Sequence, residues 1–191
     1  MKSKTYTVPF RRKREGRTHY RKRKSLLESG LPRLVVRRFL KNIQAQIVAF
    51  APDGDRVLAA VHSAELGKFG WKAGRGNIPS AYLVGLLVGK KALAKNIKEA
   101  VLDIGMHPSV KGSRIYAVLK GVTEAGVHVP HDAGILPPKE RLEGKHVALY
   151  ASSLPKETLK SRFSGYAKSG VNPSEMEQHV DACKKKIMSK P

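Results

Sequence analysis

The chain has 191 residues, and its 37 lysines and arginines against 15 acidic residues give a formal charge of +22. This charge indicates a polyanionic partner, with nucleic acid ahead of an acidic membrane surface. An apolar fraction of 41% suffices for one packed domain with extensions, and no apolar run reaches the roughly 18 residues of a membrane span. The basic N-terminus lacks the apolar segment of a secretory signal and Cys183 is the single cysteine, so we expect a cytosolic protein without disulfides.

The first 24 residues carry eleven basic residues against Glu15, a net charge of +10. A block of this density repels itself, so we expect residues 1–14 to form an extended arm, with Pro9 disfavouring a helix before it. A helix is predicted from Thr18, as its N-terminal cap, to Ser29. We expect Leu26 and Leu27 to anchor this basic helix to the body.

Three strands are predicted next, separated by short turns. Their apolar and β-branched content and alternation place them at Arg33–Leu40, Ile43–Phe50 and Arg56–His62. Connections this short imply an antiparallel meander.

A long helix is predicted from Ile78 to about Lys95, with Asn77 as its cap, after a short helix opened by Ser63. Small side chains recur along the long helix and would let it lie close against the sheet, at Ala81, Gly85, Gly89 and Ala92.

A fourth strand, Glu99–Gly105, follows that helix and should therefore run parallel to an earlier strand through a right-handed crossover. Ser113–Ala125 is predicted as a second helix and Gly126–Val129 as a short extended piece. A further helix from Lys139 to about Ser153 should break near Gly144.

The tail is expected to be helical, with one helix around Leu159, Phe163 and Tyr166 and a last helix opened by Ser174. The last helix should bury one stripe, formed by Met176, Val180, Cys183 and Ile187. The predicted fold is thus α/β, a mixed sheet of a three-strand antiparallel meander plus a parallel strand, packed with helices. Its parts are a basic arm (1–14), an α/β RNA-binding body (15–153) and a helical C-terminal extension (154–191).

The N-terminal segment supplies most of the candidate RNA contacts. Arginine and lysine bind phosphates, and Tyr20 or His19 could stack on unpaired bases. The alternative is a tail that only confers solubility or targeting. The candidates here are Arg11, Arg12, Lys13, Arg14, Arg17, Thr18, Tyr20, Arg21, Lys22, Arg23 and Lys24.

A second set of candidates lies in the body. Arg37 and Arg38 are neighbours on a strand and should face opposite sides of the sheet, as a second RNA contact or as an ordinary charged face. In the glycine-rich loop at 70–76, glycines allow close approach to phosphate, and Trp71 either stacks on a base or fills the core. The remaining candidates are Lys41, Asn42, Lys72, Arg75, Asn77, Lys111 and Arg114.

Catalytic and metal sites are not supported by the sequence. The stretch from Gly85 to Lys91 has three residues between its glycines rather than four, and it lies inside a helix, so it is no phosphate loop. His128 and His131 form no ligand set, and no second carboxylate is placed beside Asp103, so a two-metal nuclease centre is unsupported. A nucleic-acid enzyme, and a basic protein binding DNA or membranes without specificity, remain the alternative hypotheses.

Several segments together resemble the ribosomal large-subunit protein eighteen family, archaeal type, whose eukaryotic counterpart is large-subunit protein five. They are RRKREGRTHYRKRKSLLESGLPRLVVRR, GWKAGRGNIPSAYLVGLLVGKKAL, AVLDIG, KGSRIYAVLKGVTEAG, ILPPKERLEGKHVALYA and FSGYAKSGVNP. The resemblance implies a non-catalytic ribosomal protein without cofactors, bound to 5S rRNA in the central protuberance. It also implies contacts with large-subunit rRNA and neighbouring ribosomal proteins, no membrane partner, and an RNA-binding segment from Arg11 to Lys24. The family fold is related to a ribonuclease-like architecture, but the acidic catalytic cluster of such ribonucleases is missing from this sequence.

Overall fold

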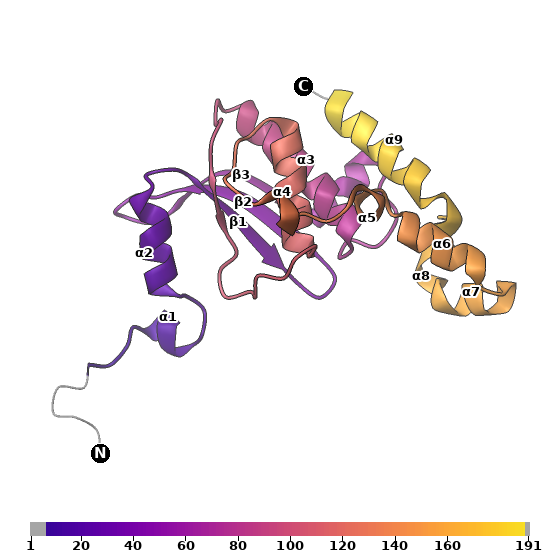
Figure 1. The fold of residues 1–191 in the computed structure, drawn as a ribbon, viewed down its shortest axis with the longest axis horizontal. Helices are drawn as coiled ribbons and strands as arrows, with labels where there is room; N and C mark the ends of the chain where they lie inside the picture. Colours follow the sequence, from indigo (N-terminus) through magenta and orange to yellow (C-terminus); the bar gives the residue numbers. More distant parts are fainter. Residues whose placement is uncertain (1–6, 190–191) are drawn as a thin grey trace, which may run out of the picture.

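The computed structural model describes residues 7–189, without the side chains of residues 156 and 157, and this part of the chain contains a four-stranded mixed sheet in the order β3-β2-β1-β4. Helices cover one face of the sheet, and the N-terminal segment lies at the end of the molecule opposite the C-terminal helices (Figure 1). The α/β prediction is confirmed.

The strands are β1 (Arg33–Arg38), β2 (Ile43–Ala49), β3 (Arg56–His62) and β4 (Val101–Asp103). β2 pairs antiparallel with β1 and β3, and β4 pairs parallel with β1, as predicted. β4 is shorter than expected because the chain turns at Gly105, where φ is +61°. The predicted short strand at 126–129 contributes one isolated parallel bridge.

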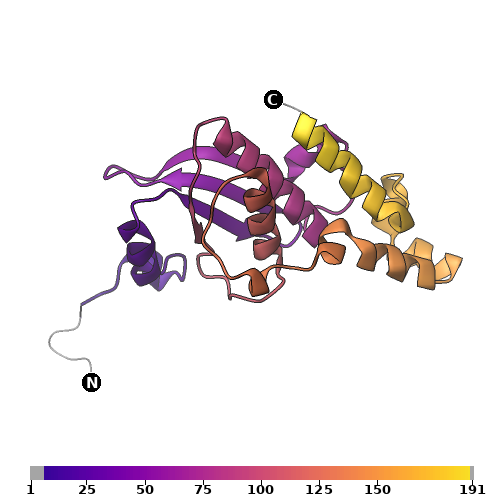
Figure 2. The same cartoon turned by 45° about the horizontal axis from the view of Figure 1, so that its top comes forward.

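Two helices, α3 (Ile78–Leu93) and α4 (Arg114–Ala125), lie side by side over the sheet (Figure 2). The two glycines of the predicted small-residue stripe, Gly85 and Gly89, lie against α4, which corrects the expectation that the stripe serves a close approach to the sheet. A Cβ atom at Gly85 would collide with the carbonyl oxygen of Val118, and one at Gly121 would collide with the backbone of α3. The glycines therefore allow two helix backbones to meet over the core.

The C-terminal helix belongs to the same core. α9 (Met176–Ser189) buries the predicted stripe of Met176, Val180, Cys183 and Ile187 against the rest of the fold. The ammonium of Lys90 on α3 donates to the carbonyl oxygens of the last turn of α9, at 2.7 and 3.1 Å. The remaining C-terminal helices are α5 (Lys139–Glu143), α6 (Lys145–Ser153), α7 (Lys156–Arg162) and α8 (Ser164–Lys168).

Three short 3-10 helices connect these elements: η1 (Ser63–Phe69), η2 (Ala133–Ile135) and η3 (Pro173–Glu175). Asn172, and not Ser174, caps the start of η3, where its side chain accepts the Ser174 N–H. The predicted helix through Phe163 is interrupted there, so it forms two short helices, α7 and α8.

The N-terminal segment forms α1 (Arg11–Arg14) and α2 (Tyr20–Glu28), so the expectation of an extended arm up to residue 14 is wrong for its last turn. Residues 1–6 of that arm lie outside the described part. His19, and not Thr18, caps α2, because its Nδ1 accepts an amide N–H of the first turn at 3.2 Å. Likewise His62 caps η1 in place of Ser63.

Candidate nucleic-acid interface

The N-terminal basic segment, defined as residues 10–28, forms two short helices joined by a loop. The rings of Phe10 and Tyr20 contact each other with centroids 5.2 Å apart. Nε of Arg12 donates to Oγ1 of Thr18 at 2.9 Å, which joins the start of α1 to the start of α2. These contacts give the segment a defined shape before any partner is bound.

Most cations of this segment have no acidic partner. Glu15 pairs with Arg11 at 2.7 Å and with Arg17 at 3.2 Å. Arg23 pairs with Asp55, which lies outside this segment. Within residues 7–189, six exposed basic side chains of the segment make no ion pair with a carboxylate: Arg12, Lys13, Arg14, Arg21, Lys22 and Lys24.

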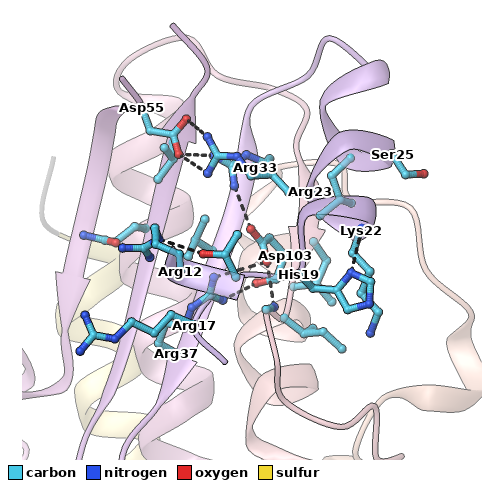
Figure 3. A pocket seen from close by; sticks show the side chains of 18 of the residues that line it. Arg12, Arg17, His19, Lys22, Arg23, Ser25, Arg33, Arg37, Asp55 and Asp103 are labelled. Atoms are coloured by element: carbon cyan, nitrogen blue, oxygen red, sulfur yellow. Dashed lines mark hydrogen bonds and ion pairs between the residues drawn. The ribbon is translucent and has the colours of Figure 1, made fainter. Parts of the chain in front are cut away.

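A network of charges fixes α2 to the open face of the sheet (Figure 3). Arg23 of α2 donates twice to Asp55 in the turn before β3, at 2.8 and 2.9 Å. Arg33 of β1 bridges the same carboxylate at 2.6 Å and Asp103 at 2.9 Å, and Arg37 approaches Asp103 at 3.4 Å. The network borders a cavity of about 550 Å³ between α2 and the sheet.

The charge network gives α2 defined contacts with the turn before β3, whereas its leucines are not part of the described core. Leu26 and Leu27, the expected anchors, are only partly buried and lie outside the described hydrophobic core. Burial opposes ionisation of Asp55, but hydrogen bonds from Arg23 and Arg33 outweigh it and hold its pKa below the ordinary value. The carboxylate is therefore ionised at neutral pH and binds both arginines.

Arg33 was missed from the sequence, although its side chain is 4% exposed and it links both acids. Its one visible signal is an arginine directly before buried strand residues, because its partners lie 22 and 70 positions away. Asp55 and Asp103 are thus engaged by arginines. No cluster of three potential metal-binding side chains occurs among the described residues.

The opposite face of the sheet carries a separate group of cations. Arg38 points away from Arg37, as the strand geometry predicts, and its Nε lies 3.5 Å from Nδ1 of His107. Arg114, the first residue of α4, donates to the carbonyl oxygens of Gly76 at 2.8 Å and of Phe39 at 3.5 Å. His107 was not among the sequence candidates, because a lone histidine in a loop carries no pattern.

Three of the RNA-binding candidates in the body have side chains that are buried or hydrogen-bonded within the fold. Trp71 is 3% exposed and its indole N–H donates to the Gly74 carbonyl, so it fills the core and has no exposed face for stacking. The Asn77 side chain caps α3 through the Ser80 N–H at 2.9 Å. Asn42 accepts a hydrogen bond from a buried serine hydroxyl. Four other basic candidates of the body are exposed and make no ion pair in the described part of the chain: Lys41, Lys72, Arg75 and Lys111.

None of the described helices is long and apolar enough to cross a membrane. Residues 4–100 match the family model described as ribosomal large subunit proteins 60S L5 and 50S L18. The chain is 49% identical to large ribosomal subunit protein uL18 of Methanococcus maripaludis over 186 residues, which is 96% of either chain.

Proposed function

This chain belongs to the family of ribosomal large-subunit proteins 60S L5 and 50S L18, and from this premise we propose that it binds 5S rRNA in the central protuberance and joins it to large-subunit rRNA. It is a structural protein of the large ribosomal subunit, and so of the translating ribosome in the cytoplasm, and not an enzyme. Its partners are rRNA and ribosomal proteins. The proposal concerns which RNA it binds and which residues bind it.

The observation that carries the proposal is the row of exposed, carboxylate-free cations on α1 and α2. Unpaired cations gain the most from phosphate, because no internal ion pair has to break first. The Arg23–Asp55 pair holds α2 in one orientation, so the charges are presented as a fixed pattern. A fixed pattern fits one RNA shape better than a flexible tail does.

A second RNA contact on the opposite face supports a joining role. Arg38 and Arg114 lie there, with exposed Lys41 and Lys111 in the neighbouring turn and loop. Two cationic faces on one sheet allow two RNA segments to be bound at once. We no longer propose RNA contacts for three candidates, because their side chains are buried or hydrogen-bonded within the fold: Trp71, Asn42 and Asn77.

We retain the division into arm (1–14), body (15–153) and C-terminal extension (154–191), but assign part of the extension to the core of the body. Residues 1–14 and α2 bind RNA from the N-terminal end of the body, whereas α9, within the extension 154–191, completes the core. The extension would therefore serve stability first, and contacts with neighbouring ribosomal proteins second.

The test is the affinity for isolated 5S rRNA across a series of salt concentrations, with and without residues 1–24. If the six cations neutralise phosphates, the truncated chain should lose affinity, and its log–log salt slope should become shallower by roughly 0.7–0.9 for each phosphate lost. Salt-insensitive and undiminished binding by the truncated chain would refute the role of the segment.

Two controls sharpen this test. Changing Lys13 and Arg14 to glutamine removes two free charges and keeps the Arg23–Asp55 pair, so any loss of affinity then comes from charge and not from misplacement of α2. Duplex DNA of matched length is the competitor. Equal affinity for DNA and 5S rRNA at moderate salt would indicate a general polyanion binder and contradict the proposal.

A further inference from the structure

Three basic side chains converge at the carboxyl ends of β1 and β4. They are Arg38 at the end of β1, His107 in the loop after β4, and Arg114 at the start of α4, and we name them the Arg38 cluster. Each is partly exposed, so an external group can reach it. The cluster lies on the face of β1 opposite to the Asp55 and Asp103 network.

The Arg38 cluster has no internal counter-charge. Within the described residues, no carboxylate forms an ion pair with any of its three members, and Arg114 is held only by carbonyl oxygens. The acid nearest to His107 along the chain, Asp103, is engaged by Arg33 and Arg37. The fold therefore holds like charges together without compensation.

The electrostatics agree with this geometry. Burial, followed by Arg38, Arg37 and Arg114, lowers the pKa of His107 below its ordinary value. Burial and then Arg38 likewise lower the pKa of Arg114. Clustered cations that disfavour one another's charged forms are stabilised by an external anion.

We propose that the Arg38 cluster binds one phosphate group of an rRNA backbone and that His107 takes up a proton when this phosphate binds. This deepens the proposed function and rests on it for the identity of the anion as RNA. Among anionic groups, phosphate offers several acceptor oxygens to guanidinium forks, and the neighbouring Lys41 and Lys111 extend the positive surface along a nucleic-acid strand.

The proton count follows from the hydrogen bonds. In the free protein Nδ1 of His107 accepts from Nε of Arg38, so the ring is neutral and its proton resides on Nε2. When phosphate oxygens bind Arg38, its Nε–H turns to the anion and leaves Nδ1 free. One proton from solvent then occupies Nδ1, and the imidazolium so formed donates toward the phosphate. At a pH between the free and the bound pKa of His107, up to one proton therefore enters for each phosphate bound.

The direction of the pH dependence is fixed by the charges around His107. These are Arg37 and Arg38 from β1 and Arg114 from α4, all positive. Burial together with these charges holds the pKa of His107 in the free protein below its ordinary value, and a bound phosphate raises it. Between the free and the bound pKa, affinity for the anion should rise as pH falls, by up to about tenfold per pH unit.

The decisive experiment follows the imidazole resonances of the full-length isotopically labelled chain through a pH titration. It is run with and without sulfate, a phosphate-like dianion that does not titrate in this range, at constant ionic strength. We expect sulfate to raise the pKa of His107, whereas the chemical shifts of the exposed His128 ring should not respond to sulfate. An unchanged pKa at His107, or an equal response of the resonances of both histidines to sulfate, would overturn the proposal.

Variants give a second, independent readout. Arg38→Gln should abolish the effect of sulfate on His107, whereas Lys185→Gln should preserve it, because this exposed cation lies near the end of α9, whose last turn contacts the C-terminal end of α3 and not its start beside Gly76. With 5S rRNA or large-subunit rRNA as the probe, affinity of the unaltered chain should fall as pH rises through the interval between the free and the bound pKa of His107. His107→Gln should flatten that dependence, and a wild-type-like dependence in this variant would refute the proton uptake.

The outcomes separate this inference from the proposed function. Tight 5S rRNA binding without a sulfate effect on His107 would refute only the role proposed for the Arg38 cluster. A sulfate effect without 5S rRNA binding would leave the cluster as an anion site and refute the proposed RNA partner.

Discussion

The close crossing of α3 and α4 makes Gly85→Ala an informative perturbation. An added Cβ would collide with the Val118 carbonyl oxygen and lie 3.0 Å from Cα of Gly121. These neighbours are backbone atoms, which no rotamer change can move, so the overpacking cost should lie near the upper end of the usual range, about 3 kcal/mol. Alanine returns about 1 kcal/mol through its better helix propensity. The net loss in the free energy of unfolding is therefore about 2 kcal/mol.

Thermal unfolding followed by circular dichroism measures this loss. For a chain of this size, 2 kcal/mol corresponds to a Tm lower by about 4–8 °C. The matched control is Gly67→Ala in η1, where an added Cβ meets no atom within 4 Å and Tm should stay nearly constant. A Gly85→Ala variant as stable as the unaltered chain would refute the role assigned to this glycine. Gly85→Leu, with a larger side chain, should be less stable still.

Two further predictions concern the charges that hold and surround α2. Arg21→Gln should weaken rRNA binding and make its salt slope shallower by roughly 0.7–0.9, whereas Arg23→Gln should leave that slope nearly unchanged because Asp55 already neutralises Arg23. Equal changes in slope, measured by salt titration of binding, would contradict this distinction. Asp55→Asn should lower the free energy of unfolding at pH 7 by about 2 kcal/mol, less than for a fully buried pair because Asp55 is partly exposed and Arg33 keeps Asp103. The pKa of Asp55 is held below its ordinary 3.8, so the contribution of its carboxylate to stability is present above that pH and is lost as pH falls through the folded pKa. In denaturant titrations, the difference in the free energy of unfolding between the two proteins should therefore be smaller at pH 3 than at pH 7, and an equal difference at both pH values would refute it.

Most of the fold could be predicted because the local patterns agree with the tertiary structure. Alternating residues such as Ile43, Ala45 and Ile47 gave β2, and short turns required the antiparallel neighbours that are observed. The small residues of α3 indicated a close approach, but a sequence pattern cannot tell whether a sheet or a helix approaches. The partner of Gly85 proved to be α4, which lies more than thirty positions further along the chain.

The sequence predicted which basic residues form the candidate site, but not which of them pair with carboxylates in the fold. Arg21 and Arg23 are equivalent in composition and lie on the same helix, yet only Arg23 meets a carboxylate, 32 positions away. Trp71 shows the same limit, because burial and stacking require the same kind of side chain and only the packing decides between them. His107 is a candidate solely because the fold brings Arg38 and Arg114 to it.

The few acids near the interface determine which cations remain available for RNA. Asp55 and Asp103 bind arginines that fix α2 and the edge of the sheet, and Glu15 binds two arginines within the N-terminal basic segment. Each carboxylate thus makes at least one basic side chain unavailable to phosphate. It also fixes the positions of the neighbouring basic side chains that remain unpaired. Removing an acid would add net positive charge and strengthen long-range attraction to any polyanion. It would also loosen the arrangement of the free cations, so affinity for unrelated nucleic acids would gain relative to the cognate rRNA. On this argument the selectivity of the protein depends on its carboxylates as much as on its arginines and lysines.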